Sequence, residues 1–158
     1  ALLTQKTPGL HAEVLDLPGV VAIAREIVAS MGAAPSVTCT AYDYTRDALP
    51  GRYDAFLISG VLHREQPEGV RRIFSQVAQA AEPGAVLWLS DVMLDDDRAG
   101  PLFGAMFQLN MRVLSHDGRC HSVAEQRAWL DEVGFDVTEV HRLPAPINYT
   151  LVRAQRRA

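Results

Sequence analysis

The sequence predicts an α/β fold of the Rossmann-like kind, with a mostly parallel sheet and an antiparallel final strand. Short apolar runs of strand length alternate with segments that repeat apolar residues at helical spacing. Glycine or proline punctuates most of the boundaries between them. With 158 residues, the chain has the length of one domain with its own core.

The elements follow in regular order. Strands are predicted over 11–15, 36–40, 53–58 and 85–89, and the third is apolar enough to be buried on both faces. Helices are predicted from Pro18 to 31, over 67–81, over 101–114 and from 122 to 134. The helix over 101–114 has apolar residues on several sides, which indicates that both of its faces are covered. The last apolar runs, 135–141 and 148–152, have no helix between them and suit an antiparallel pair.

Composition excludes some classes of function. The formal net charge is -4, which gives no electrostatic reason to expect nucleic acid or an anionic membrane as a partner. No run approaches the roughly 20 apolar residues that cross a bilayer. Cys39 and Cys120 are far apart and match no metal or redox spacing, so we expect no metal site and a reducing, cytoplasmic location.

Two acidic residues follow the first two predicted strands. Ligands of open α/β sheets bind beyond the carboxyl ends of the strands. Asp16 has the acceptor oxygens for a ribose diol, and Asp43 has one for an exocyclic amine of a purine. Two alternatives remain open: Asp16 caps the helix that starts near Pro18, or Asp43 is a turn carboxylate in a loop.

The chain resembles the S-adenosylmethionine-dependent small-molecule O-methyltransferases, which include plant caffeate-type and bacterial polyketide tailoring enzymes. The similarity is collinear over nearly the whole chain. It is carried by Asp16-Leu17-Pro18, Tyr42-Asp43-Tyr44, Ser59-Gly60-Val61-Leu62-His63, Asp91 after its strand, the run DDDRAGPLF from Asp95 to Phe103, and Gly134-Phe135.

The resemblance implies S-adenosylmethionine as the cofactor and assigns residues to it. Asp16, with Leu17 beside it, would bind the ribose hydroxyls. Asp43 would bind the adenine amine and Tyr44 would pack on the adenine ring. Ser59 would lie near the sulfonium and amino-acid end of the cofactor.

The same resemblance places His63 at the catalytic base and Asp91 at the carboxylate that orients it. A phenol, with a pKa of about 10, is mostly protonated at neutral pH, whereas an imidazole, with a pKa of about 6.5, can accept its proton. An acidic partner would fix the imidazole tautomer and stabilise its protonated form. The alternative is that His63 stands at a helix edge without a catalytic role.

The acceptor is expected against the helix over 101–114. Its apolar residues Phe103, Met106 and Phe107 suit either an acceptor wall or plain packing, so we assign only Asn110 and Met111 to the acceptor. An aromatic or polyketide-like hydroxyl compound is implied by the family.

The sequence also departs from the family. The glycine-rich loop, the first strand and the amino-terminal dimerisation domain have no counterpart in it. We therefore expect residues 1–158 to be a partial catalytic domain of a homodimeric full-length protein, with a hole in its sheet between the strands at Asp16 and Phe56. Arg64 follows His63 where the family usually has an aspartate. Cys120 stands where the family has a glutamate that, like Asp91, orients the histidine.

Two other functions stay open. Because these replacements weaken the predicted base, one alternative is a protein that binds S-adenosylmethionine without methylating, as hydroxylase-like and decarboxylase-like tailoring proteins do. A nicotinamide-dependent dehydrogenase shares an acidic residue at a strand end, but the similarity at His63 and Asp91 favours a methyltransferase.

Overall fold

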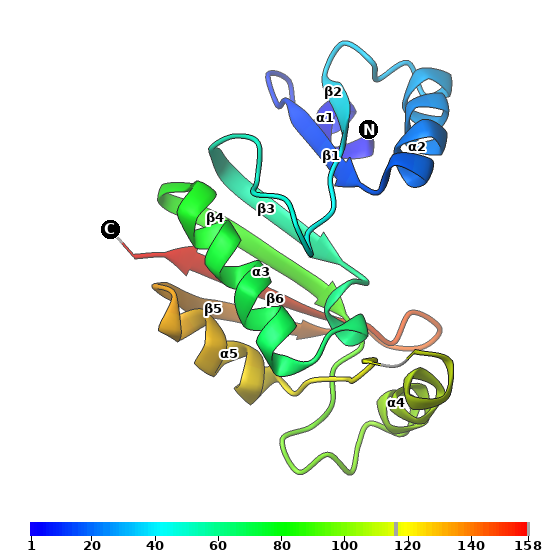
Figure 1. Ribbon diagram of the computed structural model, residues 1–158, viewed down its shortest axis with the longest axis vertical. Coiled ribbons are helices and arrows are strands. Elements are labelled where there is room, and N and C mark those ends of the chain that lie inside the picture. The colour runs from blue at the N-terminus through cyan, green and yellow to red at the C-terminus, as the bar shows by residue number, and fades with distance from the viewer. Residues whose placement is uncertain (116, 158) are drawn as a thin grey trace. The chain divides into compact units, whose positions relative to one another are not determined.

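The computed structural model describes residues 1–115 and 117–157 (Figure 1). The chain divides into two compact units, Ala1–Ala48 and Leu49–Ala158. Each unit has its own sheet. No strand pairing joins the two sheets within the described residues.

The first unit is a small β-α-β layer. It contains α1 (Leu2–Lys6), β1 (Ala12–Asp16), α2 (Pro18–Ser30) and β2 (Val37–Ala41). Strands β1 and β2 run parallel, with Asp16 level with Ala41. Helix α2 starts with proline in its first turn, and Gly32 beyond its end has a φ of 67°, a left-handed conformation that glycine adopts without strain.

The second unit is built on a four-stranded sheet in the order β3-β4-β6-β5. Its elements are β3 (Tyr53–Ser59), the 3-10 turn η1 (Leu62–Arg64), α3 (Pro67–Ala80), β4 (Ala81–Asp91), α4 (Leu102–Leu114), α5 (Val123–Glu132), β5 (Phe135–Arg142) and β6 (Thr150–Arg156). Strands β3 and β4 are parallel, and β6 is antiparallel to both β4 and β5. The predicted fold class, including its antiparallel final strand, is confirmed.

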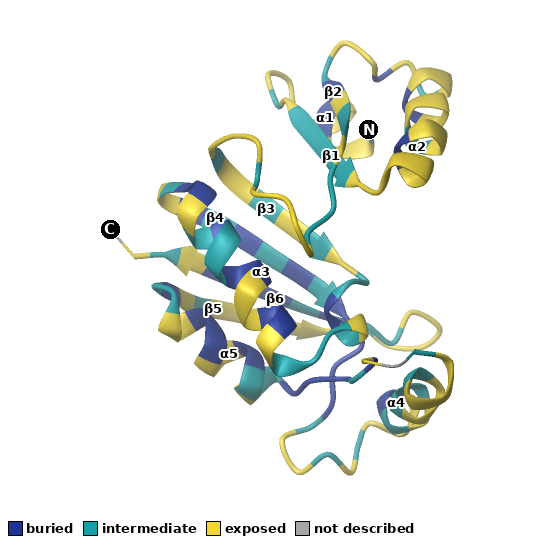
Figure 2. Ribbon diagram, in the orientation of Figure 1, coloured by how far each residue is buried: buried dark blue, intermediate teal, exposed yellow. Residues whose placement is uncertain are grey.

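The main core lies between this sheet and helices α3 and α5, which cover one of its faces (Figure 1). Along β4, fully buried residues alternate with partly exposed ones, as expected when one face of a strand is covered (Figure 2). The buried side chains include Val70, Ile73, Phe74 and Val77 of α3, Leu87 and Leu89 of β4, and Leu130 of α5. Ser122 and Glu125 form a reciprocal capping box at the start of α5.

Two expectations about burial are wrong. Strand β3 is not buried on both faces: Leu57 is 61% exposed, because helices α3 and α5 cover only one face of this sheet (Figure 1). Helix α4 is not covered on both faces either, since only Gly104 of this helix is buried and Val113 is 77% exposed. The final strand also starts and ends later than predicted, at Thr150 and Arg156. Of the helices described, none is long and apolar enough to cross a membrane.

Candidate active site

His63 and Asp91 meet at the carboxyl ends of two neighbouring parallel strands. His63 lies in η1, four residues beyond the end of β3, and Asp91 is the last residue of β4. The distance from His63 Nδ1 to Asp91 Oδ1 is 2.6 Å. Both side chains are shielded from water, with 12% and 3% of their surfaces exposed. With Asp91 ionised and His63 neutral, Nδ1–H donates to the carboxylate, so that Nε2 is the nitrogen with a free lone pair.

The Asp91 carboxylate also organises the backbone around the histidine. Its Oδ2 accepts from the backbone N–H of Leu62 at 3.0 Å and of His63 at 3.3 Å. Its Oδ1 accepts from the backbone N–H of Val92 at 2.7 Å. A buried carboxylate held by several N–H donors stays in one orientation. Asp91 therefore fixes both the turn that carries His63 and the orientation of the imidazole ring.

Helix α4 supplies an aromatic wall beside His63. The Phe107 ring meets the imidazole edge to face, with centroids 5.0 Å apart and an interplanar angle of 84°. Phe103 stacks on Phe107 at 6.0 Å and 14°. The sequence leaves both residues open as acceptor wall or plain packing, and does not predict the contact between Phe107 and His63. The available signal was that Phe107 precedes Met111 by four residues and shares its helix face.

The residues assigned to the acceptor and to the end of the cofactor flank this wall. Met111 is half-buried on the helix face that carries Phe107, whereas Asn110 is exposed. The Asn110 side chain makes no hydrogen bond within the described part of the chain. Ser59 is exposed at the end of β3, level with Ser90 of β4. Gly60 then turns the chain toward η1 with a φ of 65°.

Asp16 lies at the end of β1 in the first unit. Its Oδ1 accepts from the backbone N–H of Leu17 at 2.8 Å. Leu17, and not Asp16, is the N-cap residue of α2, and no side chain caps this helix. The backbone N–H of Tyr42 donates to the Asp16 carbonyl at 2.8 Å, which brings the start of the loop after β2 to the end of β1. The two predicted nucleotide-binding segments thus share one edge of this small sheet.

Asp43 is engaged within its own loop. Its Oδ1 accepts from the backbone N–H of Thr45 at 3.0 Å and from the Thr45 hydroxyl at 2.6 Å. Its Oδ2 accepts from Arg46 Nε at 2.9 Å. The hydrogen bonds from Thr45, followed by the Arg46 charge, hold the pKa of the Asp43 carboxyl below its ordinary value. The turn role left open as an alternative is therefore observed for Asp43. Tyr44, between these residues, is half-buried.

The predicted site residues fall into two groups. Asp16, Leu17, Asp43 and Tyr44 belong to the first unit, and Ser59, His63, Asp91, Asn110 and Met111 belong to the second. Within each unit the residues gather at the carboxyl ends of the strands or on the adjoining α4. Among the described residues, no three His, Cys, Asp or Glu side chains are grouped as they would be to hold a metal ion.

The two departures from the family pattern have plain local environments. Cys120 is fully buried and packs with Val92 and Leu94. Burial, and then the negative charge of Asp91, raise the pKa of the Cys120 thiol to about 12, so the thiol stays protonated and serves as an apolar packing group. Arg64 is exposed beside His63 in η1.

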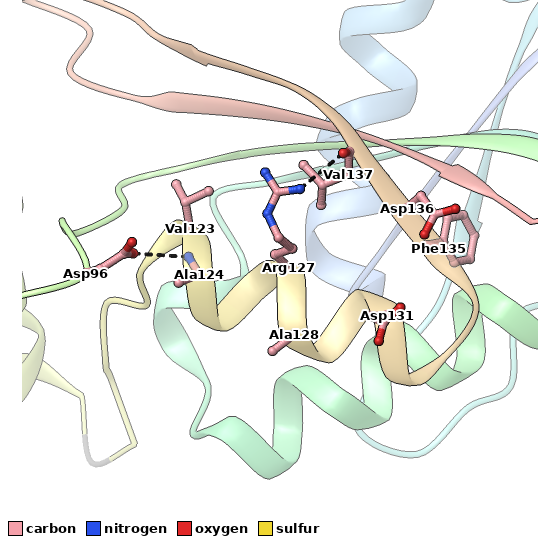
Figure 3. A pocket seen from close by; sticks show the side chains of 9 residues that line it. All are labelled: Asp96, Val123, Ala124, Arg127, Ala128, Asp131, Phe135, Asp136 and Val137. Atoms are coloured by element: carbon pink, nitrogen blue, oxygen red, sulfur yellow. Dashed lines mark hydrogen bonds between the residues drawn. The ribbon is translucent and has the colours of Figure 1, made fainter.

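A pocket of about 550 Å³ lies elsewhere, between α5 and β5 (Figure 3). Arg127 crosses it to donate to the Val137 carbonyl at 3.2 Å. Two of its acidic side chains, Asp131 and Asp136, both pair with Arg157. None of the predicted site residues lines this pocket.

Comparison with known proteins identifies the family. Residues 1–136 match the model of the O-methyltransferase domain family. The chain is 33% identical over 144 residues to 3-hydroxy-5-methyl-1-naphthoate 3-O-methyltransferase of Streptomyces sahachiroi, covering 91% of this chain and 41% of that protein.

Solved structures agree with this match. The apo S-adenosylmethionine-dependent methyltransferase SibL is 30% identical with a TM-score of 0.84, covering 99% of this chain and 46% of that one. An O-methyltransferase family 2 protein of Planctomyces limnophilus in complex with apigenin is 27% identical with a TM-score of 0.89, covering 98% and 45%. The chain thus spans less than half the length of these proteins. With its fold, the order of its strand-end residues and this match in agreement, the chain belongs to the O-methyltransferase domain family.

Proposed function

We propose that the full-length protein transfers a methyl group from S-adenosylmethionine to a hydroxyl of a small aromatic or polyketide-like acceptor, with His63 as general base. The observation that carries this proposal is the shielded pair of His63 Nδ1 and Asp91 Oδ1, 2.6 Å apart, beside the ring of Phe107. One relative is named for a naphthoate substrate, and another was solved in complex with apigenin. Both support an aromatic acceptor.

His63 performs the proton transfer in this reaction. Its Nε2 accepts the proton of the acceptor hydroxyl as that oxygen attacks the methyl carbon. Asp91, bonded to Nδ1, stabilises the imidazolium that forms. S-adenosylmethionine supplies a methyl group already activated by a sulfonium, so the carbon–sulfur bond breaks as the carbon–oxygen bond forms. The stacked rings of Phe103 and Phe107 orient an aromatic acceptor and keep water from the base.

The first unit is suited to the nucleoside part of S-adenosylmethionine. Asp16 is exposed, and its Oδ2 accepts no hydrogen bond from the described residues, so this oxygen is available to the ribose hydroxyls. Asp43 accepts the adenine amine once Arg46 moves away, Tyr44 packs on the adenine, and Leu17 lies beside the ribose. Ser59 of the second unit, exposed at the end of β3, lines the sulfonium end. Asn110 and Met111 of α4 contact the acceptor.

The proposal extends to the setting of the protein. We propose a cytoplasmic homodimer that acts in secondary metabolism on a small molecule, without nucleic acid or membrane as a partner. The apolar residues that α4 exposes, among them Leu102, Leu109 and Val113, support a subunit interface on this helix. The negative formal charge agrees with the absence of a nucleic-acid partner.

Methyl transfer can be tested directly in the full-length protein. Incubation with methyl-labelled S-adenosylmethionine and either 2-naphthol or apigenin is expected to give a labelled ether and S-adenosylhomocysteine. The remaining alternative, a protein that binds S-adenosylmethionine without methylating, predicts saturable binding in calorimetry and no labelled ether with any phenol tried. That second result would overturn the proposed function.

A further inference from the structure

Tyr149 lies beside the predicted base, although it is 86 positions further along the chain. If Gly60 carried a Cβ, that atom would lie 3.8 Å from Tyr149 Oη and 4.0 Å from His63 Cε1. The tyrosine hydroxyl and the imidazole edge thus approach the same point above Gly60. Cε1 is bonded to Nε2, the nitrogen that Asp91 leaves free to act as the base.

The position of Tyr149 is fixed by the sheet. Thr150, the next residue, starts β6 and is level with Asp91 of β4. The Tyr149 carbonyl accepts from the backbone N–H of Leu143 at 2.8 Å, which closes the loop between β5 and β6. The Tyr149 ring packs on the cluster of Val92, Leu94 and Cys120, which also supports Phe107. Tyr149 and Phe107 of the α4 aromatic wall therefore pack against the same buried cluster.

Among the described residues, none uses the hydroxyl of Tyr149 as a hydrogen-bond partner. Its side chain forms no hydrogen bond with any residue in 1–115 or 117–157, although the ring is half-buried. A tyrosine with a buried ring usually finds a partner for its hydroxyl. Because Gly60 has no side chain, none projects from this position between the hydroxyl and the imidazole edge.

We propose that Tyr149 binds the acceptor, donating a hydrogen bond to a second oxygen next to the hydroxyl that His63 deprotonates. This inference rests on the proposed function and narrows its substrate class. The acceptor is an aromatic compound with two neighbouring oxygens, one reacting at His63 Nε2 and the other held by Tyr149. A phenol without the second oxygen leaves the tyrosine hydroxyl unpaired.

Two matched probes test this assignment: 2,3-dihydroxynaphthalene, with neighbouring hydroxyls, and 2-naphthol, with one. In the full-length wild-type protein, the diol is expected to bind about three- to tenfold more tightly, as one neutral hydrogen bond predicts. Tyr149→Phe keeps the ring that packs on the core and removes only the hydroxyl. The ratio of the two dissociation constants, from fluorescence titration without turnover, is expected to fall close to one, and the ratio of the two KM values with it.

Tyr53→Phe is the matched control, since Tyr53 packs on Phe56 at the far end of β3, and it is expected to keep the wild-type ratio. A wild type that does not distinguish the probes, or a Tyr149→Phe protein that keeps the wild-type ratio, overturns the inference, even if methyl transfer is observed. A Tyr149-dependent preference for the diol without any methyl transfer supports the inference and refutes the proposed function.

Discussion

His63 Nδ1 and Asp91 Oδ1 lie 2.6 Å apart because β3 and β4 are parallel neighbours with Ser59 level with Ser90. This register brings the turn after β3 to the end of β4, where one carboxylate holds both the turn and the ring. The geometry of the proposed base thus depends on strand pairing as well as on the two side chains. Substitutions of Asp91 should therefore affect stability and activity together.

Asp91→Ala should destabilise the protein strongly. It leaves the buried backbone N–H groups of Leu62 and Val92 without an acceptor, and we expect the free energy of unfolding to fall by roughly 2–5 kcal/mol. Asp91→Asn retains one acceptor oxygen and should lose less. Urea unfolding of both variants measures the difference. As a control, Asp136→Asn removes an exposed carboxylate and should stay within about 0.5 kcal/mol of wild type. Equal stability of Asp91→Ala and wild type would contradict the structural role.

Asp16→Ala should weaken the binding of S-adenosylmethionine. The ribose hydroxyls would lose their acceptor, at a cost of about 1–3 kcal/mol. Calorimetry on the full-length protein measures this loss, and Glu26→Gln, at an exposed position of α2, is the matched control. Unchanged affinity in Asp16→Ala would show that this carboxylate does not bind the cofactor and only accepts the backbone hydrogen bond from Leu17.

Arg46→Ala should strengthen the binding of S-adenosylmethionine. Arg46 pairs with the Asp43 oxygen that the adenine amine needs. An exposed ion pair contributes little, so the affinity should rise by no more than about fivefold. The gain should shrink in high salt, where the ion pair is already weak. Weaker binding in Arg46→Ala would show that the arginine supports the loop, and that Asp43 has a structural role.

Acid should destabilise the second unit through His121. This side chain is 2% exposed; its Nε2 donates to the Glu65 carbonyl at 3.0 Å, and its Nδ1 has no partner within the described residues. Burial lowers the pKa of His121, against partial compensation by that hydrogen bond and by the Glu125 charge. The unfolded state therefore binds a proton first as the pH falls below about 6.5, and stability falls with it.

Urea unfolding between pH 7.5 and pH 5 measures this dependence. His121→Gln keeps a donor for the Glu65 carbonyl but cannot titrate, so its stability should depend less on pH. His141→Gln, at an exposed position on β5, is the control and should keep the wild-type dependence. An unchanged pH dependence in His121→Gln would exclude His121 as its source.

Sequence patterns predicted most of the fold because the helices and the strands β1, β2 and β4 carry their periodicity locally. The predictions that failed depend on which elements lie next to one another in the fold. The apolar composition of β3 suggested burial on both faces, but the helices of the second unit cover only one face of its sheet, and Leu57 is exposed. Likewise, the apolar residues of α4 did not reveal that Phe107 contacts His63.

In the candidate site, too, some contacts were predictable from the sequence and others depend on the tertiary fold. The resemblance to the family predicts His63 and Asp91 as a pair, and in the structure the two side chains are in hydrogen-bonding contact. The position of Tyr149 was not predictable, because it depends on the antiparallel register that sets Thr150 level with Asp91. Nor does the sequence indicate that Arg46 folds back on Asp43.

The central claim is that His63 is the general base, and single-turnover methyl transfer by His63→Ala tests it most directly. With saturating S-adenosylmethionine and 2,3-dihydroxynaphthalene at pH 7, the full-length variant should react about 10²–10⁴-fold more slowly than wild type. Its affinity for S-adenosylmethionine should be unchanged, and its rate should recover in part at high pH, where the phenol ionises unaided. A wild-type rate for His63→Ala at pH 7 would contradict the account.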